Sequence, residues 1–238
     1  MKKSILFVTF LLVSAFAYNA MAQQFSMPSQ SFSQTKTSYI TKNDDSVTEA
    51  KILILKYKKG QIAEMKVKDE TGNKIKIKPT DIKMMYLPQS MLDKIGQADK
   101  FLTDAKLWKS DNLDNSKIAD GYVYFESTDV KFGKKIQKLL MQVVNPAFCS
   151  KVKIYNDPFA SETMGVGVGG ITLAGGDLKS YYFKKGDEPA VLLQKKDYKK
   201  KFAEIWSDCP ALIEKYGEKP VWNDLAQHVY EYSTICNQ

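Results

Sequence analysis

The sequence contains no arginine: all 35 of its Lys-or-Arg positions are lysine, in a chain of 238 residues. Arginine presents a planar fork that recognises phosphate, carboxylate or guanine through paired hydrogen bonds, whereas lysine presents only a point charge. This absence argues against specific recognition of nucleic acid. The formal net charge of +8 instead indicates solubility, or a general attraction to anionic surfaces.

Histidine and cysteine are also scarce, with one histidine, His228, and three cysteines, Cys149, Cys209 and Cys236. The cysteines form no CxxC pair, and their spacing does not suit a zinc site. Cys149, His228 and Asp208 can be written as a nucleophile, a base and an orienting acid, but nothing in the sequence near Cys149 activates a thiol. We therefore predict no catalytic residue, no metal and no cofactor.

Long apolar runs are missing after the first 22 residues. Ile5–Ala17 is apolar, follows Lys2 and Lys3, and precedes the small residues of Ala20-Met21-Ala22. This pattern predicts a signal peptide over 1–22, cleaved near Gln23, with an uncleaved anchor as the alternative. No later segment approaches the ~20 apolar residues of a membrane-spanning helix. The expected location is therefore periplasmic, outer-surface or secreted, and the exported chain keeps 33 lysines against 27 acids.

Export implies an oxidising compartment, which favours one disulfide among three cysteines. Apolar residues recur at helical spacing up to Cys209, and again from Trp222 to Cys236. The two cysteines therefore lie on the apolar stripes of two predicted helices, where facing stripes can bring them together. We predict a Cys209–Cys236 disulfide; pairing with Cys149, or a fully reduced chain, remains the alternative.

The clearest local pattern is a three-strand meander. Apolar residues occupy Ile52–Tyr57, then alternate with polar residues over Ala63–Lys68 and Lys74–Lys78, with glycine-containing turns between them. Such alternation predicts antiparallel hairpins with one aliphatic face. The other face carries five lysines, which we call the lysine face: Lys66, Lys68, Lys74, Lys76 and Lys78. It is a candidate patch for an anionic surface, with an ordinary solvated face as the alternative.

The rest of the sequence predicts three segments after the signal peptide. Residues 23–50 are expected to form a flexible or irregular leader, 51–195 a β-rich domain, and 196–238 a helical segment packed on it. Leu139–Val144 suits either a strand or the end of a helix. Strand composition also occurs in Gly121–Glu126, Lys151–Tyr155 and Ser180–Lys184. The fold class that we predict is α+β, mostly antiparallel, with amphipathic helices at the C-terminal end.

Two further segments invite a functional interpretation. Ser90–Lys109 has partly helical spacing, and Ser110–Asp120 is expected to be a polar loop in which Asp111, Asp114 and Asp120 are solvated rather than calcium-binding. The glycine-rich segment Gly165–Gly176 lacks the Lys-Ser or Lys-Thr pair of a phosphate loop. We interpret it as a structural loop, or as a loop that inserts into a partner or a lipid surface.

Three short motifs in the sequence carry a resemblance to a known type of protein. They are the Gly-turn-strand-Pro-x-Asp-Ile pattern of Gly72–Ile82, the aromatic strand Tyr181-Tyr182-Phe183, and a closing Asp208-Cys209-Pro210 with Cys236. With the signal peptide, this layout resembles small exported proteins of Bacteroides-type Gram-negative bacteria. The resemblance implies an envelope or secreted location and brings no activity or functional residues.

Three functional classes follow from these observations. The first is a non-catalytic envelope or secreted protein that binds another envelope protein or an anionic surface polymer. The second is a membrane- or matrix-associated structural component that uses the glycine-rich segment. The third is a hydrolase that uses carboxylates or Cys149. The sequence favours the first class, since no catalytic constellation is evident.

Overall fold

The computed structural model describes residues 23–90, 113–160 and 178–236. Three predictions fall outside these ranges: the signal peptide, almost all of the helical spacing in Ser90–Lys109, and the glycine-rich segment Gly165–Gly176.

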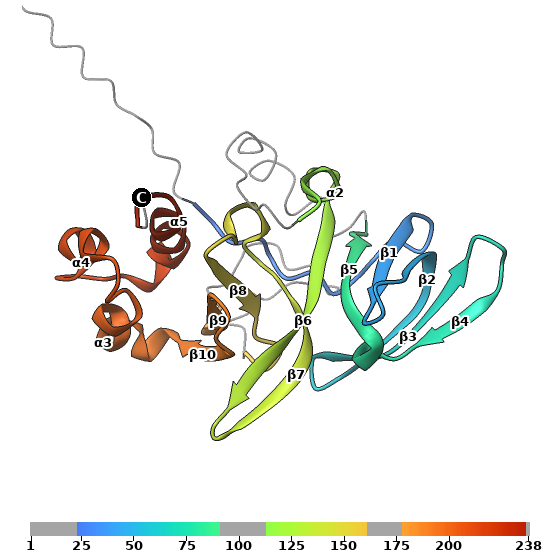
Figure 1. The fold of residues 1–238 in the computed structure, drawn as a ribbon, viewed down its shortest axis with the longest axis horizontal. Helices are drawn as coiled ribbons and strands as arrows, with labels where there is room; N and C mark the ends of the chain where they lie inside the picture. The colour runs from blue at the N-terminus through green and yellow to red at the C-terminus, as the bar shows by residue number, and fades with distance from the viewer. Residues whose placement is uncertain (1–22, 91–112, 161–177, 237–238) are drawn as a thin grey trace, which may run out of the picture.

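One twisted sheet dominates the described residues (Figure 1). Its strand order is β4-β3-β2-β1-β5-β6-β10-β9-β8, and β7 pairs with β6 off this path. All neighbours are antiparallel except β10 and β6, which run parallel. The strands are β1 (Thr37–Lys42), β2 (Val47–Lys58), β3 (Gln61–Asp69), β4 (Lys74–Ile77), β5 (Ile82–Pro88), β6 (Tyr122–Phe132), β7 (Lys135–Gln142), β8 (Val152–Asn156), β9 (Ser180–Lys185) and β10 (Ala190–Gln194).

The predicted meander is confirmed as β2, β3 and β4. The β2–β3 turn contains Gly60 at φ +72°, a left-handed conformation that glycine adopts without steric cost. A Cβ atom at Gly60 would lie 2.3 Å from the carbonyl oxygen of Pro158. This turn therefore requires glycine for two reasons, its backbone angle and its close approach to the segment after β8.

The leader expected over 23–50 is largely ordered, and that prediction is wrong for its second half. Strand β1 and the start of β2 lie within it, because alternate residues such as Ile40 and Ala50 are buried in the core. Residues 23–36 are mostly irregular, but aromatic side chains anchor them. The ring of Phe25 lies 5.1 Å from that of Tyr181, and Phe32 is 5.9 Å from Phe125.

Strand β6 runs through the middle of the molecule and separates two cores. Its odd residues Val123 and Phe125 face the core enclosed by β1–β5, whereas the even residues Tyr124 and Val130 face a second core. One edge of β6 pairs with β7. The other edge pairs first with β5 and then, near Val130, with β10. Beyond β7, Val143 bridges to Tyr155 of β8, which closes a ring of pairings β6-β7-β8-β9-β10.

Between β5 and β8, the structure corrects one sequence prediction and settles another that was ambiguous. The polar loop expected at Ser110–Asp120 contains a short helix, α2 (Asn115–Ala119), because Asp114 caps it by accepting hydrogen bonds from the backbone N–H groups of Ser116 and Lys117. The ambiguous run Leu139–Val144 is mainly strand, and it forms the second half of β7. Two 3-10 turns, η1 (Pro79–Asp81) and η3 (Pro146–Phe148), begin at prolines.

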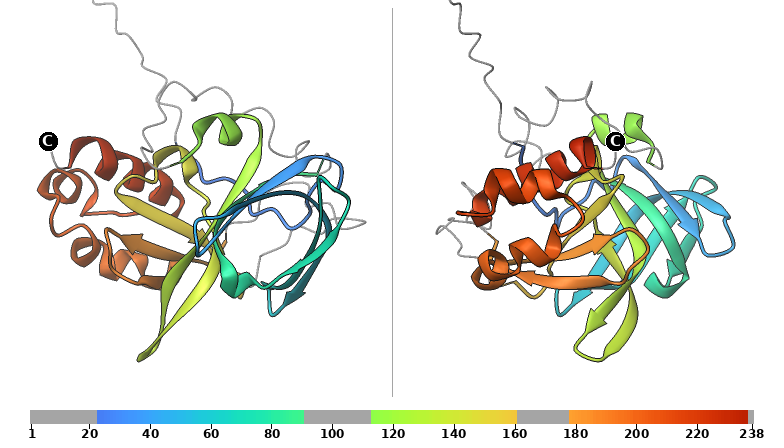
Figure 2. Two further views of the ribbon diagram at one scale, coloured as in Figure 1. Left: turned by 45° about the vertical axis from the view of Figure 1, so that its right-hand side comes forward. Right: turned by 60° about the vertical axis from the view of Figure 1, so that its left-hand side comes forward.

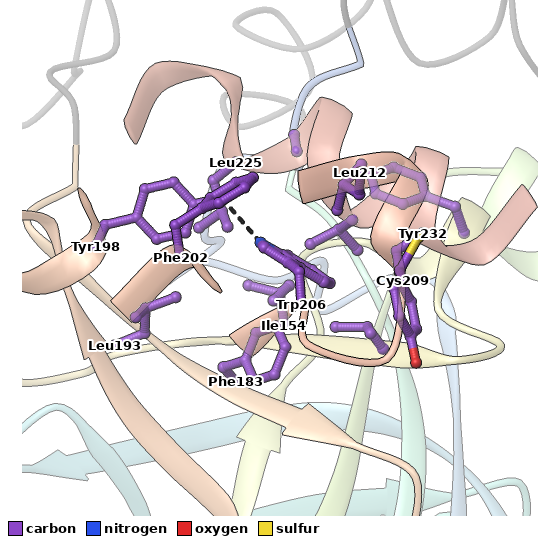
Figure 3. Close-up of a cluster of buried hydrophobic side chains, with 14 of the residues drawn as sticks. Ile154, Phe183, Leu193, Tyr198, Phe202, Trp206, Cys209, Leu212, Leu225 and Tyr232 are labelled. Atoms are coloured by element: carbon purple, nitrogen blue, oxygen red, sulfur yellow. Dashed lines mark hydrogen bonds between the residues drawn. The ribbon is translucent and has the colours of Figure 1, made fainter. Parts of the chain in front are cut away.

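The C-terminal helices gather at the end of the molecule opposite β1–β4, against β8–β10 (Figure 2). They are α3 (Lys195–Ile205), α4 (Pro210–Tyr216), the 3-10 turn η5 (Trp222–Asp224) and α5 (Leu225–Ile235). Their shared core is aromatic: Trp206, Tyr198 and Phe202 are almost fully buried, and Trp206 Nε1 donates to the Tyr198 hydroxyl at 3.4 Å (Figure 3). The architecture is thus a mostly antiparallel sheet with a few C-terminal helices.

Candidate functional site

The lysine face lies on the exposed side of the β2–β4 meander. The register places Lys66 directly opposite Lys76, and Lys68 opposite Lys74. Lys78 follows β4 and is exposed. Directly opposed Cβ atoms in an antiparallel pair are about 5 Å apart, so these pairs hold like charges close together.

Burial of the other face fixes the direction of these lysines. Met65, Val67 and Ile77 alternate with the lysines and are buried in the core of β1–β5. A slip of one residue in register would bury the ammonium groups and expose these apolar side chains. The orientation of the lysine face therefore follows from the core.

One carboxylate, that of Glu64, lies among the lysines. Its oxygens are 2.9 Å from Nζ of Lys76, 3.5 Å from Lys56 and 3.7 Å from Lys66. The hydrogen bond from Lys76 is the main reason that the pKa of Glu64 lies below its ordinary value; burial opposes the shift, and the other two lysines add to it. Glu64 therefore stays ionised while serving three ammonium groups, and the surface keeps an excess of positive charge.

Strand β2 extends this surface beyond the sequence prediction. Lys51 is paired with Lys68, and Lys56 with Glu64, so both join the lysine face. Glu49, two residues before Lys51 on the same strand, adds a second acid at the rim. The result is a lysine-rich surface on three neighbouring strands.

The three residues considered for cysteine catalysis do not form a common site. Cys149 is buried in the core beneath β6, while His228 is buried in the helical core. The third residue, Asp208, pairs with Lys185 at 2.5 Å and accepts from the Tyr232 hydroxyl at 2.6 Å. Each of the three thus has a structural environment of its own.

His228 is held in an aromatic surround. Its Nδ1 lies 2.6 Å from the Tyr198 hydroxyl, and the rings of Tyr216 and Phe202 are 4.4 and 5.2 Å away. Burial lowers the pKa of His228 to about 4, although Asp224 acts in the opposite direction. The imidazole is therefore neutral at pH 7, and its role is in packing.

A half-buried polar cluster that the sequence analysis missed lies inside the ring of β6–β10. Glu126 accepts from Nζ of Lys153 at 2.9 and 2.7 Å, from the Tyr155 hydroxyl at 2.5 Å and from the Tyr124 hydroxyl at 3.0 Å. Burial, followed by the charge of Glu126, raises the pKa of both tyrosines, so they remain protonated donors. The carboxylate is satisfied from within the protein, which gives the cluster a structural role.

The signal for this cluster in the sequence was faint. Glu126 alternates with Tyr124 and Thr128 on the inward face of a strand, where an acid needs partners. Lys153 and Tyr155 lie on β8, more than 25 residues away, and only the fold brings them to Glu126.

The sulfur chemistry is that of a structural bridge. Cys209 and Cys236 form a disulfide, with Cα atoms 5.4 Å apart, that ties the start of α4 to the end of α5. Cys149 lies outside this bridge and is buried. The pairing agrees with the two apolar stripes in the sequence.

The described residues hold no metal-binding cluster and no membrane-spanning helix. In residues 23–90, 113–160 and 178–236, no three His, Cys, Asp or Glu side chains are grouped so that they could hold a metal ion. Asp114 serves as a helix cap, and its hydrogen bond with Lys117 lowers its pKa to about 2; Asp120 ends α2, and Asp111 lies outside the described residues. No helix in the described part of the chain is long and apolar enough to cross a membrane.

Comparison with known proteins adds no relative. No protein-family model, no curated protein and no solved structure matches this chain.

Proposed function

We propose that this chain is an exported, non-catalytic binding protein that attaches to an anionic surface polymer through its lysine face. The predicted signal peptide motivates the export. The disulfide and the lack of a membrane-spanning helix in the described residues are compatible with it. We take the polymer to be an anionic polysaccharide. Its spaced carboxylates can each be met by the point charge of a lysine, without the paired hydrogen bonds that arginine would supply.

The observation that carries the proposal is the pairing of Lys66 with Lys76 and of Lys68 with Lys74 on one exposed face. Like charges directly opposite one another destabilise a sheet. A polyanion laid across the two strands would relieve this repulsion, so the same feature that costs stability in the free protein favours binding. Contacts of this kind weaken as salt screens them, with a Debye length of about 10 Å at 0.1 M and 3 Å at 1 M.

Retention on immobilised polygalacturonate tests the proposal. The wild-type protein should be retained at low salt and released well below 1 M salt. A lysine near an anionic surface contributes roughly 1 kcal/mol, so the triple substitution Lys66→Gln, Lys74→Gln and Lys76→Gln should weaken binding by up to about a hundredfold.

Helix α3 offers a matched control. Lys196, Lys199 and Lys200 are exposed there, at the other end of the molecule from the meander. Changing these three to Gln removes the same charge and should leave retention nearly unchanged. Equal losses in the two variants would mean that net charge alone is responsible, and no retention of the wild type would make the lysines a solubility feature.

A further inference from the structure

Gln23, at the predicted cleavage site, lies against helix α5. Its backbone N–H donates to Oε1 of Gln227 at 3.1 Å, and Nε2 of Gln227 donates to Oε1 of Glu231 at 2.9 Å. A single side-chain amide therefore connects the backbone nitrogen of Gln23 to a carboxylate.

The carboxylate of Glu231 can accept more hydrogen bonds than it does. Glu231 is 8% exposed, and its Oε1 also accepts from Lys215 and from the Tyr216 hydroxyl, each at 2.8 Å. Its Oε2 is buried and has no hydrogen-bond partner among the described atoms. Buried polar atoms without a partner are uncommon and costly, so the negative charge of Glu231 is not fully satisfied by its present contacts.

Contacts further along the leader hold Gln23 in place. The Phe25 ring packs against Phe148 and Tyr181, with ring centroids 6.2 and 5.1 Å away. The N–H of Ser26 donates to the carbonyl of Val144 at 2.7 Å. These contacts involve only residues after the cleavage site, so they persist whatever precedes Gln23.

We propose that cleavage between Ala22 and Gln23 creates an α-ammonium group that docks on Gln227 and Glu231. The proposal rests on the export proposed above. A peptide N–H supplies one donor and no charge, whereas an ammonium supplies three donors and a positive charge. Gln227 takes one of these donors, and the charge faces Glu231 across one amide, in a partly buried setting where attraction is stronger than in water.

The docked ammonium gives the mature chain an interaction that the precursor lacks. It ties the leader to α5, the helix whose C-terminal end is held by the Cys209–Cys236 disulfide. Processing completes the fold at this end of the molecule.

Two defined forms of the protein test this: one that starts at Gln23 and one that retains Ala20-Met21-Ala22 before it. At pH 7 the form starting at Gln23 should melt about 2–4 °C higher, the shift produced by one modest interaction in a chain of this length. The difference should shrink near pH 9.5, where a free α-amine, with an ordinary pKa of about 8, loses its charge. Intact mass confirms that Gln23 has not cyclised.

Substitution of Glu231 distinguishes docking of the Gln23 ammonium from a general effect of the three extra residues on stability. With Glu231→Gln in both forms, the difference in melting temperature should disappear. With Glu218→Gln, a change of an exposed acid in the nearby turn, it should remain. Equal melting temperatures of the two unsubstituted forms, or a difference that survives Glu231→Gln or pH 9.5, would overturn the proposal. Retention on polygalacturonate is measured on the same proteins. Failure of the proposed binding function can therefore be distinguished from failure of the docking proposal.

Discussion

Lowering the pH should destabilise this protein through His228, and the effect can be calculated. Burial lowers the pKa of His228 to about 4, from an unfolded value of 6.5. Between these two values the unfolded chain binds a proton that the folded chain does not, so the free energy of unfolding falls as the pH falls. The shift corresponds to a loss of about 3 kcal/mol when fully developed, of which about 2 kcal/mol appears between pH 7 and pH 5.

The chain suits this measurement because it contains a single histidine. Another titratable residue on α5, Glu231, acts in a lower range: burial opposes the shift, but hydrogen bonds from Lys215, Gln227 and Tyr216 lower its pKa below 4.5. The stability contributed by Glu231 is therefore lost only as the pH falls below that value. Urea unfolding followed by tryptophan fluorescence at pH 7, 6 and 5 isolates the contribution of His228.

The substitution His228→Asn keeps an acceptor near the position of Nδ1, which the Tyr198 hydroxyl contacts, and removes the titrating group. The variant should be less stable than the wild type at pH 7, because the smaller side chain leaves a cavity. Its free energy of unfolding should nevertheless change little between pH 7 and pH 5. A wild-type protein that keeps its stability to pH 5, or a variant that loses as much as the wild type, would refute this account of the buried imidazole.

Two further predictions concern the disulfide and a turn. Denatured, unreduced protein from an oxidising compartment should show one reactive thiol, that of Cys149, while Cys209→Ala with Cys236→Ala should cost about 2–4 kcal/mol in a denaturant titration; three thiols would disprove the bridge. Gly60→Ala should destabilise more than Gly133→Ala. Both glycines have positive φ, but only at Gly60 would the new Cβ meet the backbone of Pro158; equal losses on thermal unfolding would contradict this.

The parts of the fold that sequence reasoning predicted are those fixed by local pattern. Alternation in β2–β4 fixes which side chains share a face, so the lysine face could be placed without coordinates. The stripes ending at Cys209 and Cys236 likewise predicted that both cysteines are buried, although they lie just outside the helices, Cys209 before α4 and Cys236 after α5. Strand β1 was missed because Thr37–Lys42 is short and polar, and its identity depends on pairing with β2 and β5 on both sides.

Strand β6 shows why the remainder could not be predicted. Only Gly121–Glu126 carried strand composition, yet the strand continues to Phe132 because β7 pairs with one edge and β10 with the other. The inward direction of Glu126 has meaning only once β8 supplies Lys153 and Tyr155. A site assembled from strands distant in sequence leaves almost no local pattern.

In this chain without arginine, lysine and tyrosine together pair three acids, of which Glu126 and Glu231 are largely buried and Asp208 is exposed. Arginine offers five donors in one group, whereas a lysine offers three on a flexible stem. Here each of the three acids receives a lysine together with one or more tyrosine hydroxyls: Glu126 from Lys153, Tyr155 and Tyr124; Glu231 from Lys215 and Tyr216; Asp208 from Lys185 and Tyr232. The tyrosines supply directed hydrogen bonds, and the lysine supplies the charge. These three acids are thereby neutralised locally. On the lysine face, in contrast, Glu64 must serve three ammonium groups, and that is where the positive charge remains available to a partner.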